Sequence, residues 1–131
     1  MRTIDEYFAR VRQLIQAVPG VYAERYEEQI LTSIRGNLRI RLQFSDQSLL
    51  EISEAIVLIG EESRWLSYRY HYQSPGTGLI FRYDNAPHHP EISSHPDHKH
   101  TRDSVVASPH PSIEQVLEEA QAFRGGGTSR N

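Results

Sequence analysis

The chain has 131 residues, of which 37% are hydrophobic and 24% are charged, and its formal net charge is −3. This composition is typical of one soluble globular domain, and the negative total excludes general binding of nucleic acid through bulk charge. The chain has no cysteine, which excludes disulfides and thiolate zinc sites. Neither a signal peptide nor an apolar run of roughly 18 residues is visible, so we expect a cytoplasmic protein that does not enter the membrane.

A helix is predicted at the start of the chain. Thr3 and Glu6 have the spacing of a capping box, in which each side chain satisfies a free backbone amide at the start of the helix. Apolar residues then recur at three- and four-residue spacing until Pro19 and Gly20 end the helix. The resulting apolar stripe consists of Ile4, Phe8, Val11, Leu14, Ile15 and Val18.

Strands are predicted through the middle of the chain. From Asn37 to Phe44, polar and apolar residues alternate strictly, which is typical of a strand with one buried face. The other strand-like runs are residues 22–31, 49–58, 64–73 and 78–84. Because short turns separate several of these runs, we expect neighbouring strands to pair in antiparallel fashion.

The turn at residues 74–77 allows the register of one hairpin to be predicted. With Gln73 opposite Gly78, Tyr70 lies opposite Phe81. One face of the hairpin then carries Tyr68, Tyr70, Tyr72, Leu79, Phe81 and Tyr83, and we expect it to be core. The other face carries Arg69, His71, Ile80, Arg82 and Asp84.

A second helix is predicted near the end of the chain. Ser112 and Gln115 form another capping box. The apolar face that follows consists of Ile113, Val116, Leu117 and Ala120. We expect the helix to end at the glycines of residues 125–127, so that residues 1–124 form one domain and residues 125–131 a flexible tail. The predicted fold is α+β, an antiparallel meander of about four or five strands with an N-terminal and a C-terminal helix.

Histidine is concentrated between the last predicted strand and the second helix. Five of the seven histidines lie in residues 88–100. Paired imidazoles can take and return a proton near neutral pH, and neighbouring cations can stabilise a pentavalent phosphate. The candidates are His88, His89, His98 and His100 for proton transfer, with Lys99, Arg82 and Arg69 as cations. This chemistry suits the cleavage of RNA, whose 2′-hydroxyl is a built-in nucleophile, and it needs no metal.

Three other interpretations of this segment stay open. His98 and His100 lie on one side of an extended stretch and are candidate metal ligands, and His88, His89, Glu91 or Asp84 could complete the set. The positive charges of Lys99 and Arg82 and the scarcity of carboxylates argue against a metal, so we expect neither a metal nor another cofactor. The segment also suits passive binding of a phosphate or a partner protein. Finally, histidines in a proline-rich loop can be purely structural.

Parts of the sequence resemble the TumE family of toxins. The residues that carry this resemblance are "LIFRYDNAPHHPEI", the "HKH" that follows and "PSIEQVLEEA", and a looser similarity covers residues 36–120. The pattern of the family matches at Arg82, Tyr83, Asp84, Asn85, His88, His89, His98, Lys99 and His100. The sequence departs from it at His95, where an aromatic residue is usual, and at Asp97, where a further histidine is usual.

The resemblance implies a small cytoplasmic toxin from a bacterial or archaeal type II toxin–antitoxin pair. Its partner would be a TumA-like antitoxin with a helix-turn-helix DNA-binding domain. The sequence is also compatible with a homodimer. The resemblance does not identify the RNA target or a mechanism.

We therefore hypothesise that the protein is a toxin and a small histidine-dependent ribonuclease. The catalytic residues would be His88, His89, His98, His100 and Lys99, and the substrate-binding residues would be Arg69, His71, Arg82, Tyr83, Asp84 and Asn85. Two alternatives remain open. One is a non-enzymatic toxin or binding module whose histidine-rich segment binds a partner protein or nucleic acid. The other is a metal-dependent nuclease.

Overall fold

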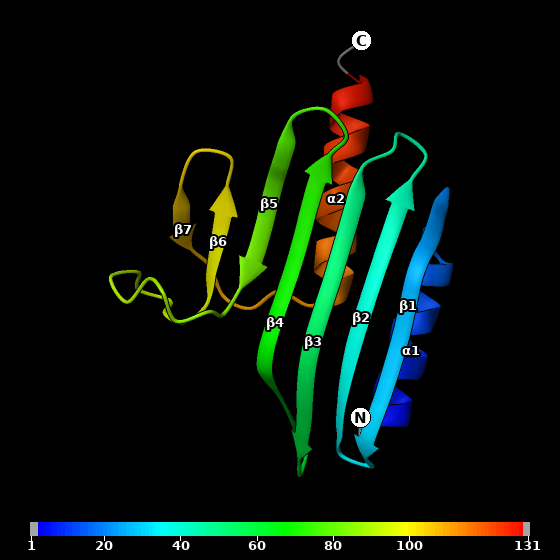
Figure 1. The fold of residues 1–131 in the computed structure, drawn as a ribbon, viewed down its shortest axis with the longest axis vertical. Coiled ribbons are helices and arrows are strands. Elements are labelled where there is room, and N and C mark those ends of the chain that lie inside the picture. The colour runs from blue at the N-terminus through cyan, green and yellow to red at the C-terminus, as the bar shows by residue number, and fades with distance from the viewer. Residues whose placement is uncertain (1–2, 130–131) are drawn as a thin grey trace.

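The computed structural model describes residues 3–129, with side chains described from residue 3 to residue 123. Within these residues it contains two helices and seven strands (Figure 1). In chain order they are α1 (Ile4–Gln16), β1 (Val21–Thr32), β2 (Arg35–Phe44), β3 (Leu49–Ile59), β4 (Glu62–Ser74), β5 (Gly78–Asp84), β6 (His98–Thr101), β7 (Val105–Ala107) and α2 (Ile113–Ser129).

The strands form one antiparallel sheet in which each strand pairs with the next along the chain. The predicted α+β class, the meander and the two helices are confirmed. The predicted number of strands is wrong, because β6 and β7 add a short hairpin within the segment that we interpreted as a loop. With only four and three residues, these strands are too short to show an alternating pattern.

Both helices pack against the same face of the sheet, and we call this the covered face (Figure 1). The predicted alternation of β2 is confirmed, since Leu38, Ile40, Leu42 and Phe44 are all buried. The apolar positions predicted for the two helices are also buried, apart from Leu14, which is partly buried, and Tyr7 joins them from α1. The opposite side of the sheet, the open face, therefore carries polar and charged side chains at the alternate positions.

The predicted register of the β4–β5 hairpin is wrong by two residues. Tyr70 lies opposite Tyr83 rather than Phe81, because Ser74 pairs with Gly78 and a bulge follows Tyr72. The shift leaves the β4 residues and residues 81–84 on their predicted faces, but the bulge reverses Leu79 and Ile80, so that Ile80 packs against the core. The five aromatic residues of this face, Tyr68, Tyr70, Tyr72, Phe81 and Tyr83, are indeed buried, while Leu79 is half-buried.

The predicted capping interactions are present at both helices. Ser112 and Gln115 exchange two hydrogen bonds of 2.9 and 3.1 Å between side chain and backbone, and the Thr3 hydroxyl accepts from the Glu6 amide at 3.2 Å. The predicted end of the second helix is wrong, because α2 continues through the glycines to Ser129. Glycine weakens a helix by about 1 kcal/mol per residue without preventing it. Residues 130 and 131 of the predicted tail lie outside the described residues.

Gly36 of β2 lies where α1 approaches the sheet most closely. A Cβ at this position would come within 2.9 Å of both the Gln29 carbonyl oxygen and Ile4 Cγ2, and within 3.1 Å of Phe8 Cζ. The backbone oxygen cannot move without breaking the pairing of β1 with β2. The absence of a side chain at Gly36 therefore sets the distance between α1 and the sheet.

We expect Gly36→Ala to lower the free energy of unfolding by about 1–3 kcal/mol, because the added methyl group overpacks this contact. Gly76→Ala is the matched control, since a Cβ there meets no atom within 4 Å. Thermal or denaturant unfolding of both variants tests the expectation. Equal stability of the two variants would contradict the close packing of α1 on β2.

Candidate functional site

A cleft of about 450 Å³ lies on the open face, where β4, β5 and β6 meet the segment between Asp84 and His98. Its walls consist of Leu66, Ser67, Tyr68, Arg69, Arg82, Asp84, Asn85, Ala86, Pro87, His88, His89, His98 and His100. The cleft thus contains the four histidines that the sequence assigned to proton transfer, together with Arg69, Arg82, Asp84 and Asn85.

Side-chain hydrogen bonds of Asp84 and Asn85 attach the segment that closes the cleft to the sheet. The Ala86 amide donates to Asp84 Oδ1 at 3.0 Å, which turns the chain directly after β5. The side chain of Asn85 reaches back, and its Oδ1 accepts from the Tyr68 amide of β4 at 3.1 Å. Asn85 therefore fixes the start of the loop, and His88 and His89, a few residues later, lie at the cleft.

Three imidazoles, those of His89, His98 and His100, form what we call the histidine cluster. One ring nitrogen from each lies within 4.8 Å of the other two. His98 and His100 are two residues apart on β6, so both face the same side of the sheet, and their Nε2 atoms are 3.1 Å apart. The loop then folds His89 over them, with its ring centroid 4.9 Å from that of His98.

The carboxylate of Asp84 lies beside the histidine cluster because β5 pairs with β6. Asp84 is the direct partner of His98 in this pairing, and Arg82 is the partner of His100. Asp84 Oδ1 lies 3.0 Å from His98 Nε2, and Oδ2 lies 3.5 Å from His100 Nε2. Arg82 Nε is also 3.5 Å from Asp84 Oδ2. Asp84 is nearly buried, so its charge acts in a region that is poorly screened by solvent.

The hydrogen bonds of His98 direct the hydrogen of a neutral ring away from Asp84. Its Nδ1 lies 2.9 Å from the Pro96 carbonyl oxygen, which can only accept, so Nδ1 carries a hydrogen. In a neutral ring, Nε2 can accept from His100 Nε2, but its lone pair also faces the Asp84 oxygen at 3.0 Å, which is repulsive. A proton or a cation between Nε2 and the Asp84 carboxylate relieves this repulsion. At His100, burial and the charge of Arg82 lower the pKa, which favours the neutral ring.

Lys99 and Tyr83 lie on the covered face, across the sheet from the cleft. Lys99 Nζ is 2.7 Å from Glu119 Oε2 of α2, and the Tyr83 hydroxyl donates to Glu119 Oε1 at 2.5 Å. The ammonium also lies 5.0 Å from the centre of the Tyr83 ring. These two residues, which the sequence placed in the site, therefore connect β5 and β6 to α2.

The remaining predicted site residues differ in exposure. His88 is exposed at the rim of the cleft. His71 is half-buried beside Arg82 but does not line the cleft, and its Nε2 lies 2.9 Å from Gln73 Oε1. Burial lowers the pKa of His71. His95 is exposed on the loop and lies outside the cleft, in agreement with the departure from the family pattern at this position.

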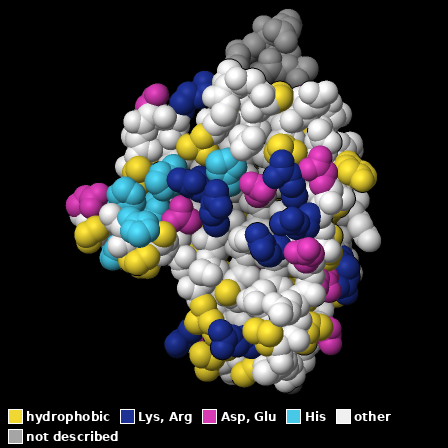
Figure 2. Space-filling model, in the orientation of Figure 1, with side chains coloured by type: hydrophobic (Ala, Val, Ile, Leu, Met, Phe, Trp, Pro, Cys, Tyr) yellow, Lys and Arg dark blue, Asp and Glu magenta, His cyan; other side chains and the backbone are white. Residues whose placement is uncertain are grey.

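Two rows of paired residues lead across the open face into the cleft. The first row is Glu27, Arg39, Ser53, Arg69, Asp84 and His98, one residue from each of β1 to β6. The second row is Arg25, Arg41, Glu51, His71, Arg82 and His100. Figure 2 shows Lys and Arg side chains gathered over the middle of this face with the histidines beside them. The rows join the cleft to a basic surface.

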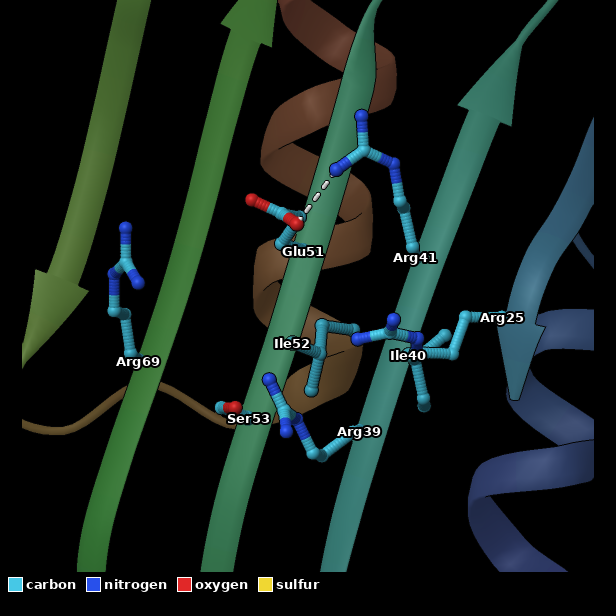
Figure 3. Close-up of a pocket in the computed structure, with 8 residues that line it drawn as sticks. All are labelled: Arg25, Arg39, Ile40, Arg41, Glu51, Ile52, Ser53 and Arg69. Carbon is cyan, nitrogen blue, oxygen red and sulfur yellow. Dashed lines mark hydrogen bonds and ion pairs between the residues drawn. The ribbon is translucent and has the colours of Figure 1, made fainter. Parts of the chain in front are cut away.

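A recess of about 60 Å³ lies within these rows, and three of its arginines, Arg25, Arg39 and Arg41, are functional candidates that the sequence analysis did not select (Figure 3). Arg25, Arg39, Arg41 and Arg69 line it. Arg41 is held by Glu24 and Glu51, each at 2.8 Å. Within the described part of the chain, Arg39 and Arg69 form no ion pair with a carboxylate, so their charges remain available to an anion. The alternation of β2 already indicated that Arg39 and Arg41 point away from the core.

Tyr68 supports the cleft from the covered face. Its hydroxyl donates to Asp97 Oδ1 at 2.9 Å, which attaches the far end of the loop to β4. The ring of His110 stacks on Tyr68 with a centroid distance of 3.7 Å, and its Nε2 lies 2.8 Å from the Tyr70 hydroxyl. His110 is thus a structural histidine. Burial lowers its pKa to about 4, and the charge of Asp97 opposes this shift.

The fold and the cleft define a small α+β protein with a basic open face and a histidine-lined site. Residues 11–124 match the family model described as Toxin TumE, and the chain therefore belongs to the TumE family of toxins. This confirms the resemblance seen in the sequence. No curated protein and no solved structure matches the chain. In the described part of the chain, neither helix has the length and apolar character needed to cross a membrane.

The lowered pKa of His110 predicts that the protein loses stability as the pH falls from 6.5 toward 4. In this range the unfolded chain takes up a proton at His110 and the folded protein does not, so the free energy of unfolding decreases. We expect a contribution of about 1–2 kcal/mol, because the ring is partly exposed. His110→Gln should unfold with a shallower dependence on pH, as measured by denaturant titration at pH 7 and pH 4.5. If the free energy of unfolding depends equally on pH in the two proteins, His110 is not a buried neutral ring.

Proposed function

We propose that this toxin acts on RNA as a ribonuclease, with the cleft as its active site. The observation that carries the proposal is the pair of cross-strand rows, which lead from the arginine-lined recess to the histidine cluster. Together the rows hold five arginines and three acidic residues, so this face is locally basic although the chain has a net charge of −3. Localisation of positive charge allows binding of a polyanion that bulk charge would disfavour.

The geometry of the rows suits the backbone of a single strand of RNA. Neighbouring strands lie about 4.8 Å apart, so Arg39 on β2 and His98 on β6 are separated by about 19 Å along the first row. A single-stranded segment of several nucleotides spans this distance. Arg39 and Arg69 would bind its phosphates, and Arg82 would bind the phosphate that enters the cleft. The concave position of the histidines supports an enzyme more than a module that only presents them to a partner.

The reaction that we propose is attack of an RNA 2′-hydroxyl on the adjacent phosphorus atom. The exposed imidazole of His88 accepts the proton of the 2′-hydroxyl, the new P–O2′ bond forms and the P–O5′ bond breaks. The 5′-oxygen takes up a proton from solvent as it leaves, and the proton held by His88 returns to solvent. The positive charge at the histidine cluster and the guanidinium of Arg82 stabilise the pentavalent phosphate. Proton transfer by His89, His98 or His100 stays a prediction from the sequence.

Membership of a toxin family indicates that an antitoxin partner exists. We propose that this partner is a TumA-like protein with a helix-turn-helix domain, and that the pair acts in the cytoplasm, where RNA is accessible. Binding of the antitoxin over the cleft or the basic rows would block RNA directly.

Arg82 and Lys99 lie on neighbouring strands but on opposite faces, which provides a matched test. We expect Arg82→Met and His88→Ala to abolish growth inhibition and to lower RNA cleavage by at least about 100-fold, because each removes a group beside the scissile phosphate. Lys99→Met should keep both activities, since Lys99 contacts Glu119 on the covered face. The measurements are growth without antitoxin and cleavage of labelled RNA, with thermal melts to show that each variant is folded.

The products identify the reaction. Cleavage through the 2′-hydroxyl leaves a 2′,3′-cyclic phosphate, and an RNA with a single 2′-deoxynucleotide at the cleavage site should resist. A Lys99→Met protein that is folded but inactive would contradict the assignment of faces. Toxicity without any RNA cleavage would contradict the proposed activity and favour a non-enzymatic toxin.

The basic rows predict a separate effect on RNA binding. Arg39→Gln and Arg69→Gln should each weaken binding of single-stranded RNA and lower the dependence of log Kd on log salt concentration by about one phosphate contact. Arg64→Gln is the matched control, because Arg64 lies on β4 outside both rows and is paired with Glu62. Fluorescence anisotropy at several salt concentrations measures this. The same loss for all three variants would show that binding follows total charge rather than the rows.

A further inference from the structure

A cation between His98 Nε2 and the Asp84 carboxylate would relieve the repulsion between them. We infer that His89, His98, His100 and Asp84 bind a divalent transition-metal ion, with three imidazole nitrogens and one carboxylate oxygen as ligands. The inference concerns binding of the ion and does not depend on the nature of the toxic reaction. It replaces the expectation from the sequence that the protein uses no metal.

The spacing of the candidate ligand atoms fits one ion. Atoms that lie 2.0–2.1 Å from a tetrahedral Zn²⁺ ion are about 3.3 Å from one another. The measured separations are 3.1 Å between the Nε2 atoms of His98 and His100, and 3.0 and 3.5 Å from these atoms to the Asp84 oxygens. The ligand nitrogen of His89 lies within 4.8 Å of the other two. A small rotation of this ring would complete the set, because it belongs to the loop rather than to a strand.

The nitrogens that face away from the cluster are held as they are in known metal sites. A metal-bound imidazole usually donates its other N–H to a carbonyl or a carboxylate, which fixes the ring and its tautomer. His98 Nδ1 donates to the Pro96 carbonyl at 2.9 Å, and His89 Nδ1 lies 3.4 Å from Glu91 Oε2. Both contacts leave Nε2 with the free lone pair, and for His98 this nitrogen faces His100 and Asp84.

The structure removes the two objections that the sequence raised against a metal. Lys99, whose ammonium would repel a cation, points to the covered face and is paired with Glu119. A carboxylate is present after all, because the β5–β6 pairing brings Asp84 to the cluster. Arg82 remains near, but its closest approach to Asp84 is an ion pair of 3.5 Å, which leaves oxygen lone pairs for another cation.

The donor set determines the kind of metal. Imidazole ligands favour Zn²⁺ and neighbouring transition metals, whereas Mg²⁺ and Ca²⁺ prefer a shell made entirely of oxygen. The cluster forms part of the wall of the cleft, so a bound ion would be accessible to a ligand there. Zinc can accept a fifth ligand during a reaction, and in this cleft that ligand would be a phosphate oxygen. The ion would then polarise the phosphate that Arg82 also contacts.

The test measures metal binding to the full chain prepared without a polyhistidine tag. Zn²⁺ content is measured by mass spectrometry after purification, and Zn²⁺ is then titrated calorimetrically into protein stripped with a chelator. We expect one ion per chain in the wild type and at least about 100-fold weaker binding in both His100→Ala and His89→Ala. His95→Ala is the matched control, because it removes an exposed imidazole from the same loop and should bind Zn²⁺ like the wild type.

His89→Ala keeps the test informative if His100→Ala fails to fold, because the His89 side chain lies on the loop and is 28% exposed. A replacement of Zn²⁺ by Co²⁺ should give the absorption spectrum of a four- or five-coordinate nitrogen and oxygen site. The inference is overturned if the wild type binds no Zn²⁺, or if His89→Ala and His95→Ala bind it equally. In that case the cluster holds a proton instead. Because no RNA is present, this result is independent of whether RNA is the substrate.

Discussion

The pairing of β5 with β6 is the constraint on which the site depends. It brings Asp84 next to His98 and Arg82 next to His100, although these residues are separated by more than a dozen positions in the sequence. A strand that shifted by one residue would place both histidines on the covered face. The anchors of the intervening loop, Asn85 on Tyr68 and Tyr68 on Asp97, hold both ends of the segment and thereby fix this register.

The division of the sheet into two faces explains how stability and function occupy the same strands. On the covered face, aromatic side chains and two helices form the core. Glu54 is buried there and accepts hydrogen bonds from Tyr7 and Tyr70, while burial raises its pKa. On the open face, Arg25, Arg39 and Arg69 stay exposed and lose little hydration, whereas Asp84 and His98 are buried beside each other in the cleft. The cleft therefore arises without an opening in the core.

Much of the fold could be predicted because local patterns determine it. The apolar stripe of α1, the alternation of β2 and the capping boxes depend only on neighbouring residues, and the structure confirms them. The register of the β4–β5 hairpin could not be predicted, because the loop is one residue shorter than expected, with Ser74 opposite Gly78, and a bulge after Tyr72 adds a second shift. The β6–β7 hairpin was also missed, since its strands are only four and three residues long and form by pairing with neighbouring strands.

The site was predicted in part for the same reason. The concentration of histidines indicated the segment that lines the cleft, but the direction of each side chain depends on strand alternation in β6. Lys99 was therefore included, although it faces away from its histidine neighbours. The sequence did not show whether the Asp84 carboxylate lies beside the histidine cluster or only accepts a hydrogen bond from the backbone of the turn. Arg39 was not selected, because only the alignment of β2, β3 and β4 connects it with the cleft.

The proposed function requires that the open face and its cleft contact RNA, while the helices do not. Photo-crosslinking of 4-thiouridine RNA to the full chain, followed by mass spectrometry of the crosslinked peptides, measures this contact directly. We expect crosslinks to the peptides of β2, β4 and β5 and to residues 85–100. Crosslinks confined to α1 or α2, or their persistence at equal yield in a protein with both Arg39→Gln and Arg82→Met, would contradict it.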